Sequence, residues 1–480
     1  MPMPDSDEVR STLSPIMEKF AVPGMAVAVF SGEKREALGL GVCDLEKGGT
    51  VGPDTSFQLA SCSKAYTATA AAILVDAGAM TFDDPVRQHL PEFQLHDERL
   101  TSLATLRDLL SMRLGYRGEG ILNWGRNLEL GVDTIFERMR YLEPIAGFRE
   151  LFTYLNPAYT LMSEVIARVS GKPFAEYLKE AISDPLGQNR TFIHEGCYVP
   201  DKSHAFPHGE FDDGVAPIGM AQCGGQIGES CVYSTANDAA RWMAFHLGKG
   251  EADGKRIVSA EAMAEMHRPH VYAPSVPALD NHFLSYGMGW QCRDTPNGPV
   301  LLHEGGEFGV STFTMLDPLR DNGVAVYANL NSSAAVKAST YTMIDRLAER
   351  EPRDWSSLFD TLVKQERDGV SAYYENQLAE YVQDTPEISD ILGSYFHPAN
   401  GVIDISQGEN GIDMRLRDGW VYDCVLEPAQ ENLFRGPFRF SGMQALARDG
   451  MRVRFFSDDQ GPALFAAGFG VARKVSDATA

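Results

Sequence analysis

The chain has 480 residues, of which 44% are apolar and 22% charged, values typical of a globular protein with more than one domain. Lys and Arg total 42 against 66 Asp and Glu, and the resulting net charge of −24 argues against nucleic-acid and membrane partners, because both carry phosphates that this surface repels. The polar, acidic N-terminus lacks the apolar core of a signal peptide and no run is long enough to span a membrane, so we expect a cytoplasmic protein.

The expected elements begin with an amphipathic helix at 7–20 and a hairpin of strands at 24–30 and 36–43. A buried helix follows from Ser61 to about Gly78, because its residues are small and apolar on nearly all sides. Further on, the pattern predicts a short element at 105–110 and a helix at 157–168.

The second half of the chain begins with a turn and helix at 232–248. Four strand-like runs and a helix come next, at 285–292, 299–303, 309–316, 323–329 and 333–350. Helices followed by an antiparallel meander indicate an α+β domain over 1–350, with helices against a sheet.

The pattern of apolar and polar residues changes after a charged segment at 351–385, which we interpret as a helical linker. Apolar and polar residues then alternate with a period of two, as at 412–417 and 451–455. This alternation between Gly, Asp and Asn turns predicts a small all-β domain, a barrel or a sandwich, over 386–480.

The seven cysteines are scattered, with no CxxC pair and no Cys/His cluster at zinc spacing. We therefore expect no structural disulfide, no metal site and no cofactor. The expected partner is a small-molecule or short-peptide substrate, and self-association into a homo-oligomer stays open.

The first chemical motif is Ser61-Cys-Ser-Lys64, which opens the most apolar helix of the chain. A spacing of three puts both side chains on one helical face, and burial lowers the pKa of a lysine so that its amine can accept the serine proton. A second match, from Ser31 to Lys34, lies in a hairpin turn where the lysine is solvated. We therefore predict Ser61 as the nucleophile and Lys64 as its base.

Acyl transfer also needs a second proton carrier and a polar group for the substrate amide, and Tyr-x-Asn can supply both. Tyr154-Leu-Asn156 lies on the turn before the helix at 157–168, whereas the matches at 327–329 and 374–376 fall in a buried strand and in the linker. We predict Tyr154 as catalytic and Asn156 as substrate-binding. The alternative role of Asn156 is the N-cap of the helix that follows it.

The chain resembles the class C β-lactamases and their relatives on three motifs that stand in the family's order: Ser61-x-x-Lys64, Tyr154-x-Asn156 and His303-x-Gly305. The surrounding runs at 105–115, 233–242, 286–290 and 303–318 are similar too, and the resemblance covers about residues 8–350. It implies an antiparallel sheet flanked by helices, a helical subdomain, and a serine hydrolase that forms an acyl-enzyme. It also implies that the N–H groups of Ser61 and Gly306 form the oxyanion hole.

The third motif narrows the expected substrate. Penicillin-hydrolysing relatives carry Lys-Thr-Gly there, whereas His303-Glu304-Gly305 resembles the variant of D-aminopeptidases, D-amino-acid amidases and esterases. We predict that these three residues bind a substrate without a carboxylate beside the scissile bond. Glu304 repels a carboxylate and attracts an amine if it faces the cleft, and the alternative is that its side chain points to solvent. The segment 392–419 looks like the start of the lipocalin-like barrel of such D-aminopeptidases, expected to narrow the cleft or to mediate self-association.

Several functions fit these motifs. The favoured one is that of a D-aminopeptidase or D-amino-acid amidase. A carboxylesterase or acyltransferase would use the same residues, and a β-lactamase or D-Ala-D-Ala carboxypeptidase fits the third motif less well. Cys62 could replace Ser61 as nucleophile if the helix start stabilised its thiolate. The non-enzymatic alternative is a catalytically silent, penicillin-binding-like sensor.

Overall fold

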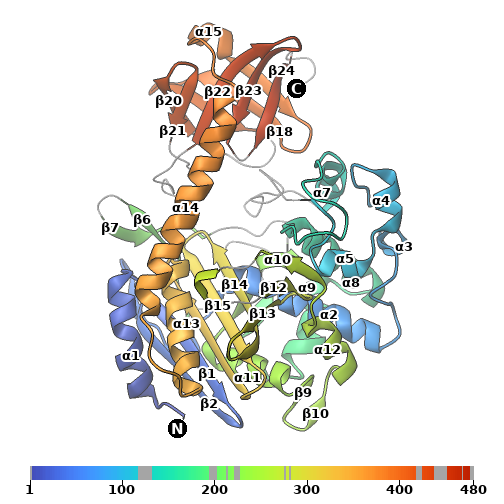
Figure 1. Cartoon of the computed structure of the whole chain (residues 1–480), viewed down its shortest axis with the longest axis vertical. Helices are drawn as coiled ribbons and strands as arrows, with labels where there is room; N and C mark the ends of the chain where they lie inside the picture. The colour runs from blue at the N-terminus through green and yellow to red at the C-terminus, as the bar shows by residue number, and fades with distance from the viewer. Residues whose placement is uncertain are drawn as a thin grey trace.

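The computed structural model describes residues 3–116, 132–193, 203–211, 214–220, 227–274, 277–279, 283–417, 424–436, 451–467 and 469–475. These residues form a large body of helices around a sheet and a small β-barrel, joined by one long helix (Figure 1). The α+β fold with a C-terminal barrel that the sequence predicts is confirmed.

A nine-stranded antiparallel sheet forms the centre of the large body, in the order β11-β12-β13-β14-β15-β16-β1-β2-β3. Its strands are β1 (Gly24–Ser31), β2 (Lys34–Asp44), β3 (Gly48–Thr50), β11 (Val271–Ala273), β12 (Phe283–Tyr286), β13 (Gln291–Thr295), β14 (Gly298–Glu307), β15 (Val310–Asp317) and β16 (Asn322–Ala328). The strands β15 and β16 are buried along their whole length, because helices cover both faces of the sheet.

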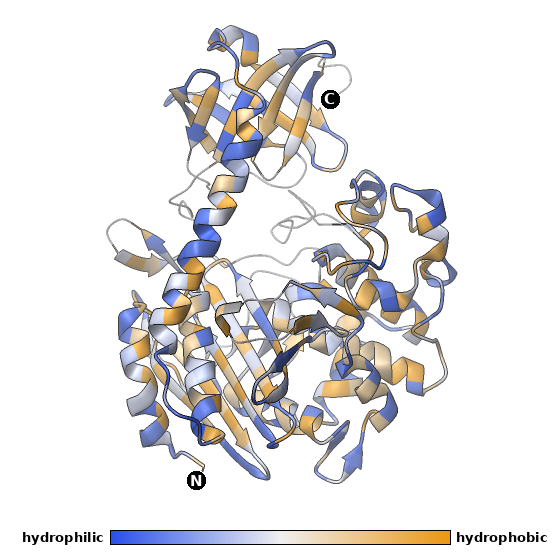
Figure 2. Ribbon diagram, viewed as in Figure 1, coloured by the Kyte–Doolittle hydropathy of each residue, from blue (hydrophilic) through white to orange (hydrophobic). Residues whose placement is uncertain are grey.

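One face of the sheet packs against helices from the first and the last part of the large body. The helices on this face, which we call the back face, are α1 (Ser6–Lys19), α13 (Ser333–Leu347) and the start of α14 (Trp355–Ala379). Their apolar residues share a core with Val27, Leu302 and Phe313 of the sheet. Figure 2 shows hydrophobic residues concentrated on the central strands, while much of α14 is hydrophilic.

The opposite face, which we call the front face, carries α11 (Ala236–Leu247), the 3₁₀ turn η1 (Ala60–Cys62) and the helix that continues from it, α2 (Ser63–Asp76). Nearly every residue of α2 is buried, because further elements surround it. These elements and their neighbours are α3 (Val86–His89), α4 (Glu98–Leu103), α5 (Leu106–Leu110), α7 (Val132–Met139), α8 (Asn156–Ser170), α9 (Phe174–Leu178), η3 (Lys179–Ser183), α10 (Ile227–Ser230) and α12 (Ala260–His267).

Short strands and turns complete the large body. They are β4 (Phe57–Gln58), β5 (Phe192–Ile193) and β8 (Val232–Ser234) in one small sheet, β6 (His208–Phe211) with β7 (Gly214–Pro217), β9 (Glu251–Ala252) with β10 (Lys255–Arg256), and η4 (Pro277–Leu279).

Two of the expected strands differ from those observed. The run 285–292 is divided between β12 and β13, because residues 287–290 turn back and the Met288 N–H donates to the Met266 carbonyl oxygen at 2.9 Å. The strand expected to end at His303 continues through Glu307. The third motif therefore lies within β14 and not at its end.

The helix α14 joins the large body to the barrel. Trp355 and Phe359 anchor its start in the back-face core, and Leu378 anchors its end in a cluster of barrel residues. A short helix, α15 (Ile388–Ile391), then leads into the closed barrel of β17 (Gly393–His397), β18 (Gly401–Gln407), β19 (Ile412–Leu416), β20 (Cys424–Gln430), β21 (Leu433–Gly436), β22 (Met451–Asp458), β23 (Gly461–Ala466) and β24 (Gly470–Val475). Phe308, in the turn after β14, packs against the barrel core.

Two further expectations concern disulfide bonds and membrane-spanning helices. Cys231 is disulfide-bonded, so the expectation of no structural disulfide is wrong. Cys43, Cys62, Cys292 and Cys424 are buried and take part in no disulfide. No described helix combines the length and apolar character that crossing a bilayer requires.

Candidate active site

Ser61 lies in η1, where the chain passes from β4 into α2 on the front face of the sheet. The preceding residue, Ala60, has a φ of 46°, in the left-handed region that a non-glycine residue rarely adopts. Backbone strain of this kind costs about 1–3 kcal/mol and is concentrated at functional sites. Ser61 is nearly buried, with 7% of the residue exposed.

The predicted base and proton carrier both reach the Ser61 hydroxyl. Lys64 Nζ lies 3.0 Å from Ser61 Oγ, and the Tyr154 hydroxyl lies 2.8 Å from the same oxygen. Lys64 is fully buried, and its Nζ is 5.0 Å from the centre of the Tyr154 ring. The three groups are thus within the distances that direct proton transfer requires.

Lys64 is also held by a segment that no sequence motif marks. The Glu229 carbonyl oxygen of α10 accepts a hydrogen bond from Lys64 Nζ at 3.0 Å. The carboxylate of the same residue, which is fully buried, accepts from Thr160 Oγ1 of α8 at 3.1 Å. Sequence reasoning missed α10 because it contributes a main-chain oxygen, which residue types do not reveal.

Asn156 begins α8 and is 2% exposed, so it is buried beside the turn that carries Tyr154. The N-cap position belongs to Leu155, and no side chain caps this helix. The alternative role of Asn156 as a cap is therefore wrong, and substrate binding stays a prediction.

His303 lies on the front face of β14, 1% exposed, with both ring nitrogens in contact with protein atoms. Its Nδ1 is 2.7 Å from the Glu304 carbonyl oxygen and its Nε2 is 3.0 Å from the Tyr286 hydroxyl. Because a carbonyl oxygen can only accept, Nδ1 carries the proton and Nε2 accepts from Tyr286. Burial, and then the charge of Lys64, lower the pKa of His303 to about 4, so the imidazole is neutral near pH 7.

The two glycines of the third motif differ in their surroundings. A Cβ on Gly305 would lie 2.3 Å from both the Leu59 carbonyl oxygen and Thr312 Oγ1, and 3.1 Å from the Ser61 nitrogen. A glycine at 305 therefore lets β14 approach the Ser61 turn. A Cβ on Gly306 would meet its nearest atom, Asn331 Oδ1, at 3.9 Å. The oxyanion hole of Ser61 and Gly306 N–H groups stays a prediction.

Glu304 does not lie where the sequence places it. Neighbouring residues of a strand point to opposite faces, so the Glu304 side chain leaves β14 on the back face. Its Oε2 lies 2.6 Å from Lys337 Nζ of α13. Burial raises the pKa of Glu304, but the Lys337 ammonium outweighs it and holds the pKa below its usual value. The prediction that Glu304 faces the cleft and acts on the charge of the substrate is therefore wrong.

Cys62, the rival nucleophile, points away from the Ser61 hydroxyl. Its thiol donates to the His303 carbonyl oxygen at 3.3 Å and accepts from Thr312 Oγ1 at 3.3 Å. Burial raises the pKa of this thiol to about 11, so it is protonated at neutral pH and a poor nucleophile. The geometry therefore favours Ser61.

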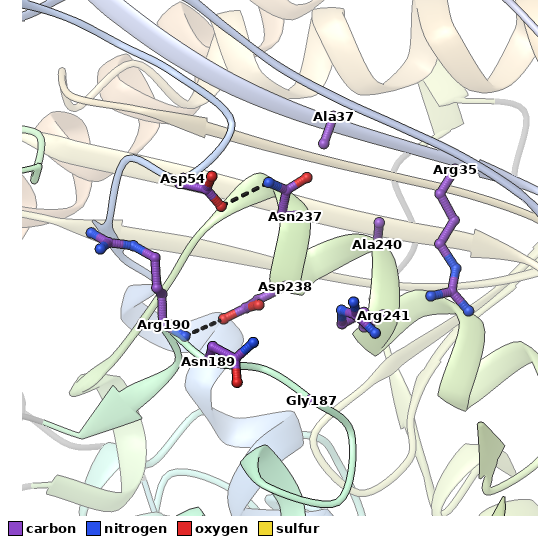
Figure 3. Close-up of a pocket in the computed structure, with 10 residues that line it drawn as sticks. All are labelled: Arg35, Ala37, Asp54, Gly187, Asn189, Arg190, Asn237, Asp238, Ala240 and Arg241. Atoms are coloured by element: carbon purple, nitrogen blue, oxygen red, sulfur yellow. Dashed lines mark hydrogen bonds between the residues drawn. The ribbon is translucent and has the colours of Figure 1, made fainter. Parts of the chain in front are cut away.

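A separate cavity of about 370 Å³ beside α11 contains none of these residues (Figure 3). Its charged lining residues are Arg35, Asp54, Arg190, Asp238 and Arg241. Arg35 and Arg241 lie 3.3 and 3.7 Å from carboxylate oxygens of Asp253, so both are paired with a carboxylate. The main-chain N–H of Arg190 donates to Asp238 at 2.9 Å. In the described part of the chain, no group of His, Cys, Asp or Glu side chains is arranged to hold a metal ion.

Comparison with known proteins identifies relatives of the large body. The family model described as Beta-lactamase matches residues 9–348. An unguisins hydrolase of Aspergillus campestris is 26% identical over 420 residues, which cover 82% of this chain and 77% of that protein. Penicillin-binding protein 4 of Amycolatopsis lactamdurans is 28% identical over 341 residues, which cover 68% of this chain and 84% of that protein.

Solved structures share the fold. A class C β-lactamase from Rhodobacter sphaeroides superposes with a TM-score of 0.59 at 22% identity, covering 72% of this chain and all of that chain (100%). An octameric penicillin-binding protein homologue from Pyrococcus abyssi gives a TM-score of 0.66 at 20% identity and covers 98% of this chain and 100% of its own. The family model spans most of the chain. This protein therefore belongs to the β-lactamase family.

Proposed function

We propose that this protein is a serine hydrolase that cleaves an amide or ester bond of a small substrate through an acyl-enzyme on Ser61. The supporting observation is that Lys64 Nζ and the Tyr154 hydroxyl meet at Ser61 Oγ, at 3.0 and 2.8 Å. This arrangement gives one hydroxyl both a base and a proton carrier, which a sensor without catalysis does not need.

In the proposed reaction, Ser61 Oγ attacks the substrate carbonyl carbon while neutral Lys64 takes the hydroxyl proton. The carbonyl π electrons move to oxygen, and N–H groups of the Ser61 turn and β14 stabilise the anion. When the tetrahedral intermediate collapses, the Tyr154 hydroxyl protonates the departing amine or alcohol, and the Lys64 ammonium returns a proton to Tyr154. In the second half of the reaction, water takes the part of Ser61 and attacks the carbonyl carbon of the acyl-enzyme ester. Ser61 Oγ is now the leaving group and regains its proton, which releases the acid and restores the free serine.

For the substrate, we propose an acyl group without a carboxylate beside the scissile bond, with a D-aminoacyl amide as the favoured class. A neutral His303 whose two nitrogens contact Tyr286 and Glu304 offers no positive charge to a carboxylate. We further propose that the barrel limits the length of the substrate, since Phe308 contacts the barrel core just beyond the third motif.

A carboxylesterase is the second candidate. Because Glu304 lies on the back face and is paired with Lys337, it does not present its carboxylate to the amine of an aminopeptidase substrate. A simple alkyl ester would meet the same neutral third motif.

The site can be tested by labelling the protein with a fluorophosphonate and mapping the adduct by mass spectrometry. We expect the label on Ser61, loss of labelling in Ser61→Ala, and unchanged labelling in Ser31→Ala, the serine of the other Ser-x-x-Lys match. A label on Cys62, or equal labelling of Ser61→Ala, would contradict the proposal.

The substrate class can be tested with D-alanine p-nitroanilide, p-nitrophenyl butyrate and benzylpenicillin under identical conditions. We expect kcat/KM for the anilide or the butyrate to exceed that for benzylpenicillin by about 10² or more, the effect of about 2.7 kcal/mol in transition-state binding. Comparable values for all three would refute the substrate assignment without affecting the assignment of Ser61.

A further inference from the structure

A cavity of about 330 Å³ lies on the back face of the sheet, directly behind the third motif. Leu302 and Phe313 line it from β14 and β15, and Leu362 lines it from α14. Its polar lining includes Arg293 of β13, Glu304 and Lys337. The cavity is therefore an apolar chamber with a charged wall, and the strand β14 separates it from Ser61.

Two cations and two carboxylates line this cavity, but only Lys337 and Glu304 form an ion pair among them. Lys337 and Glu304 are committed to each other, with Nζ and Oε2 2.6 Å apart. Arg293 is 7% exposed and donates from one terminal nitrogen to the Tyr341 hydroxyl, a neutral acceptor, while its Nε has no hydrogen-bond partner. Within the described residues, no carboxylate forms an ion pair with Arg293. The exposed carboxylate at the rim, Glu366 of α14, is screened by solvent.

An almost fully buried guanidinium without an anion is costly, since the desolvation of the charge is not offset by a partner. Arg35 and Arg241, at the other cavity, show the usual solution, because Asp253 lies beside both of them. Behind β14, Glu304 acts on Arg293 only at longer range, no described carboxylate lies within ion-pair distance of the guanidinium, and there is an open volume beside it.

We propose that this cavity is a second ligand site, which binds a small monocarboxylate with an apolar tail. The carboxylate would accept hydrogen bonds from Arg293, and the tail would lie against Leu302, Phe313 and Leu362. A volume near 330 Å³ is at the lower end of ligand pockets, which run from about 300 Å³, and suits an acid of about six carbons. The site does not depend on the reaction proposed for Ser61.

The experiment is isothermal titration calorimetry of the full chain with sodium hexanoate, and with 1-hexanol and hexylamine at the same ionic strength. We expect hexanoate to bind with one-to-one stoichiometry, and the alcohol and the amine to bind at least about tenfold more weakly. Ser61→Ala should bind hexanoate as the native chain does, which distinguishes this site from the cleft.

Two variants approach the site from different sides. Arg293→Met removes the charge and should weaken hexanoate binding about tenfold or more, while Arg293→Lys should restore part of it. Leu362→Trp fills the chamber from α14, leaves Arg293 in place, and should abolish binding. The control is Arg99→Met, an exposed arginine of α4, which should bind normally. Thermal unfolding establishes that each variant is folded. Failure of hexanoate to bind the native chain, or unchanged binding by the Leu362→Trp variant, would overturn the proposal.

Discussion

The two faces of β14 use opposite kinds of chemistry. On the front face, His303 is neutral and hydrogen-bonded to Tyr286, within reach of the field of Lys64. On the back face, its neighbour Glu304 is ionised and paired with Lys337. Adjacent residues of one sequence motif therefore lie on opposite faces of the strand, in different environments. The motif in the sequence does not show this separation.

The largest expected difference between the two faces is between two matched lysine substitutions, one on each face of β14. Lys64→Met should reduce kcat by about 10²–10⁴, because the proton of Ser61 would lose its acceptor. Lys337→Met should leave kcat within about threefold, a change below 1 kcal/mol. It should lower the free energy of unfolding by about 1–2 kcal/mol, because Glu304 loses its partner in a cavity open to solvent.

Steady-state kinetics and urea unfolding of both variants check this pair. Equal losses of kcat in the two variants would show that the two faces of β14 are not independent.

The closeness of β14 to the Ser61 turn can be tested at the two glycines. Gly305→Ala introduces a Cβ that would meet the Leu59 carbonyl oxygen at 2.3 Å, so the turn must shift. A displacement of about 1 Å at a reacting group can cost about 10² in rate, and we expect a loss of that size in kcat/KM. Gly306→Ala, whose Cβ has space, serves as the control and should stay within about threefold. Similar activity of both variants would contradict the close approach.

The free energy of unfolding should depend on pH through one titratable side chain on each face of β14, His303 and Glu304. The pKa of His303 is about 4 in the folded chain and about 6.5 when unfolded, so the unfolded state binds more protons between these values. The free energy of unfolding should therefore fall as the pH decreases from about 6.5 to about 4, by up to about 3 kcal/mol from His303 alone. Glu304, with its lowered pKa, stabilises the fold above the unfolded pKa of a carboxyl and loses this effect at lower pH.

Urea unfolding at several pH values measures both effects. His303→Gln should flatten the curve between about pH 6.5 and 4, where the imidazole of the native chain titrates. An unchanged slope in this variant would mean that the imidazole is already protonated in the fold.

The smallest expected effect concerns the partner of His303. Tyr286→Phe removes the O–H that donates to Nε2 at 3.0 Å while keeping the ring. Losing one such hydrogen bond costs about 0.5–1.5 kcal/mol, so we expect kcat/KM to fall about three- to tenfold. Nitrogen-15 NMR of the imidazole should show Nε2 losing its donor. An unchanged Nε2 signal in the Tyr286→Phe variant would mean that Tyr286 only packs against His303 and donates no hydrogen bond to it.

Local periodicity made much of this site predictable. The three-residue spacing places Ser61 and Lys64 on one side of the chain, and their distance of 3.0 Å agrees with that expectation. The turn before α8 brings Tyr154 to the same oxygen. The direction of Glu304 was not predictable because the extent of β14, and hence which face each residue meets, depends on its pairing with β15.

Contacts between distant segments were also beyond the sequence pattern. The Glu229 carbonyl is a main-chain group that any residue could provide, and it meets Lys64 through tertiary packing. Arg293 has an ordinary place in a short strand, and its burial follows from the closure of α13 and α14 over the sheet. The domain boundaries expected at 350 and 385 stay predictions.

The long helix between the two bodies has a mechanical consequence. Its ends are fixed in separate cores by Phe359 and Leu378, while Lys364 to Val370 are exposed and include Gly369, which weakens a helix interior by about 1 kcal/mol. Amide protons of this stretch should exchange with solvent before those at either end. Limited trypsin digestion should then cut first after Lys364 or Arg367, and separate the chain into one large and one small fragment.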